Sequence, residues 1–341
     1  MVKKIVILFF LFCAATMVFA SGTTEKKTLP WKPTKPITVI VPWAAGGSTD
    51  QVTRVTAGVL EDSLGQKMVI VNQPGASGSV GTKSVVDAAH DGYTWASGAA
   101  GDLGGYKVLD FLDTTLDDWV LYLNVANVAV VSVNPDTPYK TFDDLLKAFK
   151  DKPGQLTVAT AGQSSAGHNA IEAIRKFTKI EYKHVTYEGG NPAVIACVAG
   201  ETQVVTQLAV EQADMLRGGK LRALAVLADT DLEIKGYSEK IPSIKKWIPE
   251  IETGANYFGI FIPKDAPKEV IETFNILWDT VIKDNQKLKD YAADRGAVFD
   301  PSYGDVAKKK VFPFLQQVVW IYFDAGKAKR SPETIGIPRP K

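Results

Sequence analysis

Three segments rich in glycine and serine stand where strands are expected to end and helices to begin. They comprise residues 46–48, 162–165 and 189–191, and none of them contains Lys or Arg. The first turn of a helix carries unpartnered N–H groups and a partial positive charge, and glycine lets a ligand approach them closely. This pattern favours capture of a small carboxylate by amides and hydroxyls, without a dedicated cation. Glycine- and serine-capped helices also occur in domains that bind nothing, so a structural role stays open.

Nucleophilic catalysis is the competing chemistry, and its residues would be Ser165 and His168. No Gly-x-Ser-x-Gly elbow surrounds Ser165, because its neighbours are Ser164 and Ala166. The spacing of Gly162 and Gly167 resembles a phosphate-binding loop, but His168 and the following Asn replace the Lys-Ser/Thr pair that such a loop needs. We therefore predict a protein that is not an enzyme.

The chain repeats one local order of elements in its first part. A β-branched run at 38–41 precedes the first glycine segment, and Ser48 and Gln51 then stand at capping-box spacing before a helix that stops at Gly65. Similar strands are expected at 68–71, 93–96 and 125–133. Each of these elements positions the loop that follows it.

The order continues in the second part with a helix from residue 141. Strands are expected at 156–159, 183–187, 204–205 and 223–226, and Asn191 with Pro192 has the pattern of a helix start. A strand at 257–262 then leads to a helix over 270–282. This alternation predicts an α/β fold with mostly parallel sheets.

Length and composition set the domain organisation. The 341 residues exceed what one core usually serves, and 39 Lys and Arg balance 38 Asp and Glu, so nothing favours nucleic acid as a partner. Three histidines and two cysteines make a structural zinc site improbable, and no cofactor or metal is expected. We expect a discontinuous first lobe, residues 36–131 plus 257–341, and an inserted second lobe, residues 132–256.

The N-terminus has the pattern of a secretory signal peptide over residues 1–20. Lys3 and Lys4 precede an apolar run, and small residues stand at 18 and 20 ahead of the cleavage point. A lipid anchor at Cys13 is disfavoured by the bulky Phe12 before it. Residues 21–35 are expected to form a tether, and the mature protein is expected outside the cytoplasm, in the periplasm.

The ordered motifs resemble the extracytoplasmic solute receptors of tripartite tricarboxylate transporters, the TctC or Bug family. The matching stretches cover roughly residues 35–303. They read PWAAGGSTD at 42–50, NQPGASGSVG at 72–81, DGYT at 91–94, PGQLT at 153–157, GQSSAGH at 162–168, YEGGNPA at 187–193, GKLRALA at 219–225 and FGIFIP at 258–263.

This resemblance implies a two-lobed, Venus-flytrap binding protein of type II, with the ligand in the interlobe cleft. It implies a small organic acid such as a di- or tricarboxylate as ligand, membrane subunits of a tripartite transporter as partners, and a monomer. In the family, the first glycine loop and the Gly/Ser/His loop grip one carboxylate, partly through water. Carried over by position, the resemblance implies ligand contacts from Trp43, Ala45, Gly46, Gly47, Ser48, Ser77, Ala100, Thr160, Ser164, Ser165, His168, Tyr187, Gly189, Gly190 and Gln207.

Several positions depart from the family pattern or have a second interpretation. Trp43 replaces the usual Phe and would either shape the pocket wall or pack between the lobes. His90 replaces a proline, and the segment 200–207 lacks an expected aspartate, so that Gln207 stands in place of a more typical cleft residue. His168 would either bind a carboxylate or make a hinge-side or capping contact. A receptor that presents its ligand to a membrane sensor would have the same pocket, and that alternative stays open.

Overall fold

The computed structural model of the protein describes residues 28–340, so the predicted signal peptide at 1–20 lies outside the described residues. Within the predicted tether, residues 28–35 are described and lie against the folded core. Leu29 and Trp31 pack beside the buried side chains of the first lobe, and the N–H of Trp31 donates to Thr273 Oγ1 at 2.8 Å. This part of the predicted tether is therefore attached to lobe 1 by apolar side chains.

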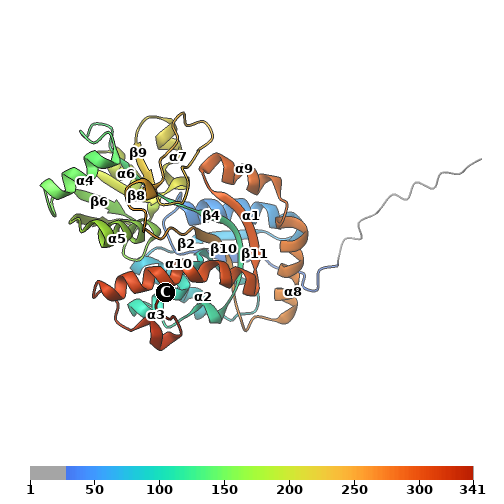
Figure 1. The fold of residues 1–341 in the computed structure, drawn as a ribbon. Helices are drawn as coiled ribbons and strands as arrows, with labels where there is room; N and C mark the ends of the chain where they lie inside the picture. Colours follow the sequence, from blue (N-terminus) through green and yellow to red (C-terminus); the bar gives the residue numbers. More distant parts are fainter. Residues whose placement is uncertain (1–27, 341) are drawn as a thin grey trace, which may run out of the picture.

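Two separate sheets organise the chain, and Figure 1 shows them in different halves of the molecule. The first has the strand order β11-β4-β10-β3-β1-β2. β1 pairs in parallel with β2 and β3, whereas β10 runs antiparallel to β3 and β4. Its strands are β1 (Ile37–Val41), β2 (Met68–Asn72), β3 (Thr94–Ala99), β4 (Trp119–Asn127), β10 (Asn256–Pro263) and β11 (Val298–Tyr303). We call this sheet with its helices lobe 1.

The second sheet, which with its helices forms lobe 2, has the order β7-β6-β8-β5-β9. β6 pairs in parallel with β7 and β8, and β5 runs antiparallel to β8 and β9. Its strands are β5 (Ala129–Val133), β6 (Thr157–Thr160), β7 (Lys183–Thr186), β8 (Val204–Leu208) and β9 (Arg222–Val226).

Both sheets are built on the same plan. In each sheet, three neighbouring strands run parallel, and the strand beside them runs antiparallel. This antiparallel strand, β10 in lobe 1 and β5 in lobe 2, begins where the chain crosses from the other lobe. The expected α/β fold is confirmed, with parallel pairs around β1 and β6, and the antiparallel pairs of β10 and β5 make both sheets mixed. The crossing strands could not be read as antiparallel from local sequence, because their direction is set by the connection between the lobes.

The chain passes from lobe 1 to lobe 2 at Val128. The strand that we expected at 125–133 is two strands: β4 ends at Asn127 and β5 begins at Ala129, each in its own sheet. The predicted lobe border after residue 131 thus falls inside β5. The crossing between the lobes gives no break in the apolar sequence, because the residues of β4 and of β5 on either side of it are buried.

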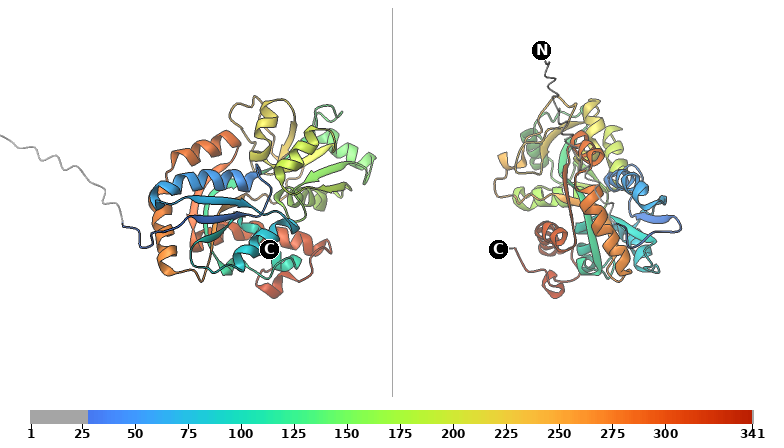
Figure 2. Two further views of the ribbon diagram at one scale, coloured as in Figure 1. Left: turned by 180° about the vertical axis from the view of Figure 1, so that it is seen from behind. Right: turned by 90° about the vertical axis from the view of Figure 1, so that its right-hand side faces the viewer.

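Helices cover both faces of each sheet, as Figure 2 shows from two further sides. In lobe 1, α1, α8 and α9 pack on one face, and α2, α3 and α10 on the other. In lobe 2, α4 and α5 pack on one face, and α6 and α7 on the other. The bounds are α1 (Ser48–Leu64), α2 (Ser79–Val86), α3 (Ala100–Leu109), α4 (Phe142–Asp151), α5 (Ala166–Thr178), α6 (Gly190–Val198), α7 (Ala209–Arg217), α8 (Lys268–Leu277), α9 (Gln286–Arg295) and α10 (Gly304–Asp324). No helix among the described residues is long and apolar enough to cross a membrane.

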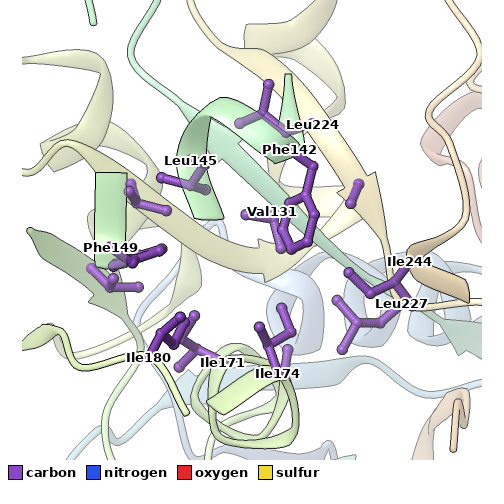
Figure 3. Packing of buried hydrophobic residues seen from close by; sticks show 14 of the residues in the cluster. Val131, Phe142, Leu145, Phe149, Ile171, Ile174, Ile180, Leu224, Leu227 and Ile244 are labelled. Carbon is purple, nitrogen blue, oxygen red and sulfur yellow. The ribbon is translucent and has the colours of Figure 1, made fainter. Parts of the chain in front are cut away.

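The core of lobe 2 shows what holds such a layer together. Phe142 and Phe149 of α4 and Ile171 of α5 meet Val131 of β5 in one cluster with almost no exposed surface (Figure 3). Full burial of each such side chain contributes about 1.5–3 kcal/mol. The layer fixes the start of α5, and with it the loop at 162–165.

Candidate ligand-binding site

A cavity of about 30 Å³ lies between the two lobes, enough for about two water molecules. It is lined from the ends of strands β3, β6 and β8 and from the first residues of α1, α5 and α6. In open α/β sheets this edge, beyond the carboxyl ends of the parallel strands, is where ligands bind. The lining residues are Trp43, Gly47, Ser48, Thr49, Ala99, Asp102, Ala161, Ser165, Ala166, Gly190, Gln207, Leu208, Glu211 and Phe258.

Six of the site residues expected from the sequence line this cavity, and nine do not. Trp43, Gly47, Ser48, Ser165, Gly190 and Gln207 are brought together there from both lobes. The ligand contacts themselves stay a prediction for all fifteen. Those outside the lining are Ala45, Gly46, Ser77, Ala100, Thr160, Ser164, His168, Tyr187 and Gly189.

The first glycine loop owes its shape to a carboxylate of its own helix. Asp50 Oδ2 accepts from the N–H of Gly46 at 3.0 Å, and Asp50 also pairs with Arg54 one turn later. Gly46 has a φ of +81°, which favours glycine, and a Cβ there would lie 3.0 Å from Asn191 Nδ2. The first and third glycine segments therefore meet across the lobes, and Ala44 N–H donates to the carbonyl of Glu188 at 3.1 Å beside them.

Ser165 is the N-cap of α5, where its Oγ accepts from the N–H of His168 at 3.3 Å. The cap orients the first turn of the helix toward the cavity. Two residues later, Gly167 packs directly on β8, where any Cβ would overlap with the carbonyl oxygen of Thr206. Close packing and capping together fix the position of this helix end.

His168 is buried behind the cavity and faces another polar group. The hydroxyl of Tyr322, at the end of α10, lies 2.9 Å from His168 Nδ1, donates to Asn169 Oδ1 at 2.7 Å and accepts from the N–H of Ser164 at 3.1 Å. The His168 ring also stacks on His184 with centroids 4.2 Å apart. Burial, together with the charge of His184, lowers the pKa of His168 to about 3, so the imidazole is neutral. His168 therefore contacts the end of α10, a helix of lobe 1, across the lobe boundary.

Glu211, near the start of α7, reaches from lobe 2 into the first glycine loop. Its Oε1 accepts from the N–H of Ser48 at 2.9 Å, across the lobe boundary, and its Oε2 accepts from the N–H of Leu208 at 3.3 Å. In the amide orientation that suits both neighbours, Gln207 donates to Oε2 at 2.8 Å and accepts from the N–H of Ala161 at 2.6 Å. Burial raises the pKa of Glu211. The Glu211 carboxyl group thus occupies some of the N–H donors of the glycine-rich loops and helix starts.

Asp102 brings a second carboxyl group to the cavity, from the first turn of α3. Its side chain accepts a hydrogen bond from Trp43, and burial raises its pKa to about 7. Desolvation outweighs the favourable position at a helix start. Trp43 therefore lines the pocket and orients an acidic group there.

A family model described as "Tripartite tricarboxylate transporter family receptor" matches residues 52–305. The chain belongs to this family. The protein is thus a receptor of this transporter family and not an enzyme. Among its relatives, BugT of Bordetella pertussis is 29% identical over 266 residues, which cover 76% of this chain and 80% of BugT.

Solved structures share the fold of the receptor. The periplasmic binding protein BugD has a TM-score of 0.80 at 22% identity, covering 87% of this chain and 100% of BugD. MatC from Rhodopseudomonas palustris with bound malate has a TM-score of 0.72 at 23% identity, covering 86% of this chain and 98% of MatC. These likenesses confirm the predicted two-lobed, periplasmic-binding-protein architecture.

Three residues that matter to the receptor's site were missed by reasoning from its sequence: Asp102, Glu211 and Tyr322. Asp102 is the only acidic residue in the first turn of α3, among small and apolar residues. This is the one sequence signal that could have indicated its role. Glu211 stands three residues after a strand end, where it reads as an ordinary helix cap. Tyr322 lies 153 residues or more from its partners in lobe 2, so no local pattern indicates its role.

Proposed function

We propose that the receptor captures a small organic acid in the interlobe cavity and delivers it to the membrane subunits of a tripartite tricarboxylate transporter. Residues 1–20 would direct its export to the periplasm. We expect the exported protein to be a monomer. The observation that supports this function is the convergence of the starts of α1, α5 and α6, from both lobes, on one cavity. Their first turns carry N–H groups with no partner inside their own helices, which suits a carboxylate.

We expect the two lobes to open for entry of the ligand and to close around it. A space of about 30 Å³ does not admit a dicarboxylate from solvent without opening. A solved neighbour holds malate, a dicarboxylate of small size. For this receptor we expect reversible binding in the submicromolar to micromolar range, which corresponds to about 8–10 kcal/mol.

A thermal-shift screen with organic acids tests the proposal, because a ligand that binds only the folded protein raises the melting temperature. Neutral sugars serve as the contrasting class of ligand. Calorimetry then gives the dissociation constant of each acid that shifts the melting temperature. If neutral sugars raise the melting temperature and no acid does, carboxylate capture is refuted.

The variant Ser165→Ala locates the site. We expect roughly 5- to 30-fold weaker binding of the acid, corresponding to about 1–2 kcal/mol for a lost donor to an anion. Thr141→Ala is the matched control, since Thr141 caps α4 in the same manner, far from the cavity, with its Oγ1 accepting from Asp144 N–H at 3.2 Å. Both variants should lose about 1 kcal/mol of stability. Equal affinities in the two variants would remove Ser165 from the site.

A further inference from the structure

The charge inside the cavity is unusual for a site that receives an anion. Two of its lining residues, Asp102 and Glu211, carry carboxyl groups, and among the described lining residues there is no Lys, Arg or His. A purely anionic ligand would meet two acidic groups without a neutralising charge. Like charges held close together in a poorly solvated site repel strongly.

Within residues 28–340, neither acidic group has a cationic partner. Only 8% of the surface of Glu211 is exposed to solvent, and its hydrogen-bond partners are the neutral amides of Ser48, Leu208 and Gln207. Asp102 has the neutral indole of Trp43 as its partner. A buried carboxyl group with neutral donors alone is costly, and a cation brought by the ligand would offset that cost.

Two further features of the site suit a cationic nitrogen. Ser164 Oγ is 93% buried by residue, has no hydrogen-bond partner among the described residues, and lines a small adjoining cavity together with Asp102. A hydroxyl oxygen accepts from an ammonium N–H. The rings of Trp43 and Phe258 form part of the main cavity wall, and aromatic faces attract cations.

We propose that the ligand carries a protonated or quaternary nitrogen in addition to its carboxylate, and that Asp102 and Glu211 bind this nitrogen. The inference rests on the proposed function, which supplies the carboxylate at the helix starts. It narrows the ligand class from organic acids to zwitterionic aminocarboxylates. Asp102 and Glu211 become specificity-determining residues, and no covalent step is involved.

Matched ligand pairs test this inference on the full mature receptor, by calorimetry at one pH and ionic strength. Glycine betaine and 3,3-dimethylbutanoate have nearly the same shape and differ in the charge of one atom. 4-Aminobutanoate with pentanoate, and aspartate with succinate, extend the comparison to other lengths. We expect the nitrogen-bearing member of at least one pair to bind at least about tenfold more tightly, since charge-assisted contacts are the strong ones.

The variants Asp102→Asn and Glu211→Gln keep the shape of each side chain and remove its charge. Each should reduce the preference within the pair to about threefold or less, while circular dichroism shows an intact fold. If one variant does not fold, the other decides. A nitrogen-free acid that binds as tightly as its partner overturns the inference. So does tighter binding of succinate to Glu211→Ala, which would make Glu211 an internal competitor of the ligand.

The outcomes separate this inference from the proposed function. If nitrogen-free acids bind tightly, carboxylate capture stands and the cation site fails. If 1,4-diaminobutane binds and loses affinity in Asp102→Asn, the cation site stands and carboxylate capture fails. If no member of the panel binds, both are overturned.

Discussion

The substitution Asp102→Asn should stabilise the ligand-free receptor, and this gain should grow as the pH rises from about 4 to about 7. Burial raises the pKa of Asp102 to about 7 in the folded protein, from 3.8 for the free side chain. Between these values the folded state binds more protons than the unfolded state. The free energy of unfolding therefore falls as the pH rises from about 4 to about 7, and it levels off above that range.

The size of this effect follows from the pKa displacement. One pKa unit corresponds to about 1.4 kcal/mol, so complete burial would cost roughly 4 kcal/mol above pH 7. Asp102 faces a cavity and keeps part of its surface exposed, so solvent screening reduces the expected cost to about 2 kcal/mol. Asparagine is neutral at every pH and retains an oxygen that can accept from the Trp43 indole.

Urea unfolding followed by tryptophan fluorescence measures this difference at pH 5, 6, 7 and 8. We expect the variant to exceed the wild type by about 2 kcal/mol at pH 8 and by much less at pH 5, with other titrating groups cancelling in the difference. Asp62→Asn, on the exposed side of α1, is the control and should differ from the wild type by less than about 0.5 kcal/mol throughout. A constant difference across the pH range, or a less stable variant at pH 8, would refute the reasoning.

Three further predictions concern the packing around the site. Gly167→Ala should lower the free energy of unfolding by more than about 3 kcal/mol, because the added Cβ would overlap with the carbonyl of Thr206. The control Gly58→Ala, which lies in open space on α1, should raise it by about 0.5–1 kcal/mol, and chemical denaturation measures both variants. Tyr322→Phe should cost about 1–3 kcal/mol in the same assay, because it leaves buried polar partners unsatisfied, and an unchanged midpoint would contradict this. The ring nitrogens of His168 should show no titration by NMR between pH 5 and 8, and a midpoint near 6.5 would show that the ring is not desolvated.

The parts of the fold that could be predicted from the sequence are those with local physical causes. The alternation of strands and capped helices follows from periodicity and from side chains such as Ser165, which caps the helix it begins. The antiparallel direction of β5 and β10 could not be predicted, because it depends on which lobe the chain enters next. The apolar run around Val128 gave no sign of the crossing, since both lobes bury their strands.

The residues of the candidate site likewise fall into those with a local sequence signature and those placed by contacts between the lobes. Ser48 and Gly190 were found because glycine and serine at helix starts have a local signature. Glu211 was missed because its role depends on an amide 163 residues away, which reaches it only when the two lobes meet. Acidic groups near a site expected to bind an anion also contradict a simple charge argument, and the structure alone shows that they lie there.

The shared plan of the two sheets has a consequence for the order in which the receptor matures. Every strand of lobe 2 lies between residues 129 and 226, so all of its strands have been synthesised before β10. Lobe 1 waits for β10, which ends at residue 263 and separates β3 from β4. Until then its first three strands form a half-sheet with an open edge at β3, so the inserted lobe 2 can complete its sheet before the discontinuous lobe 1 does. A chaperone that recognises unpaired strand edges would accordingly meet β3 on the nascent receptor.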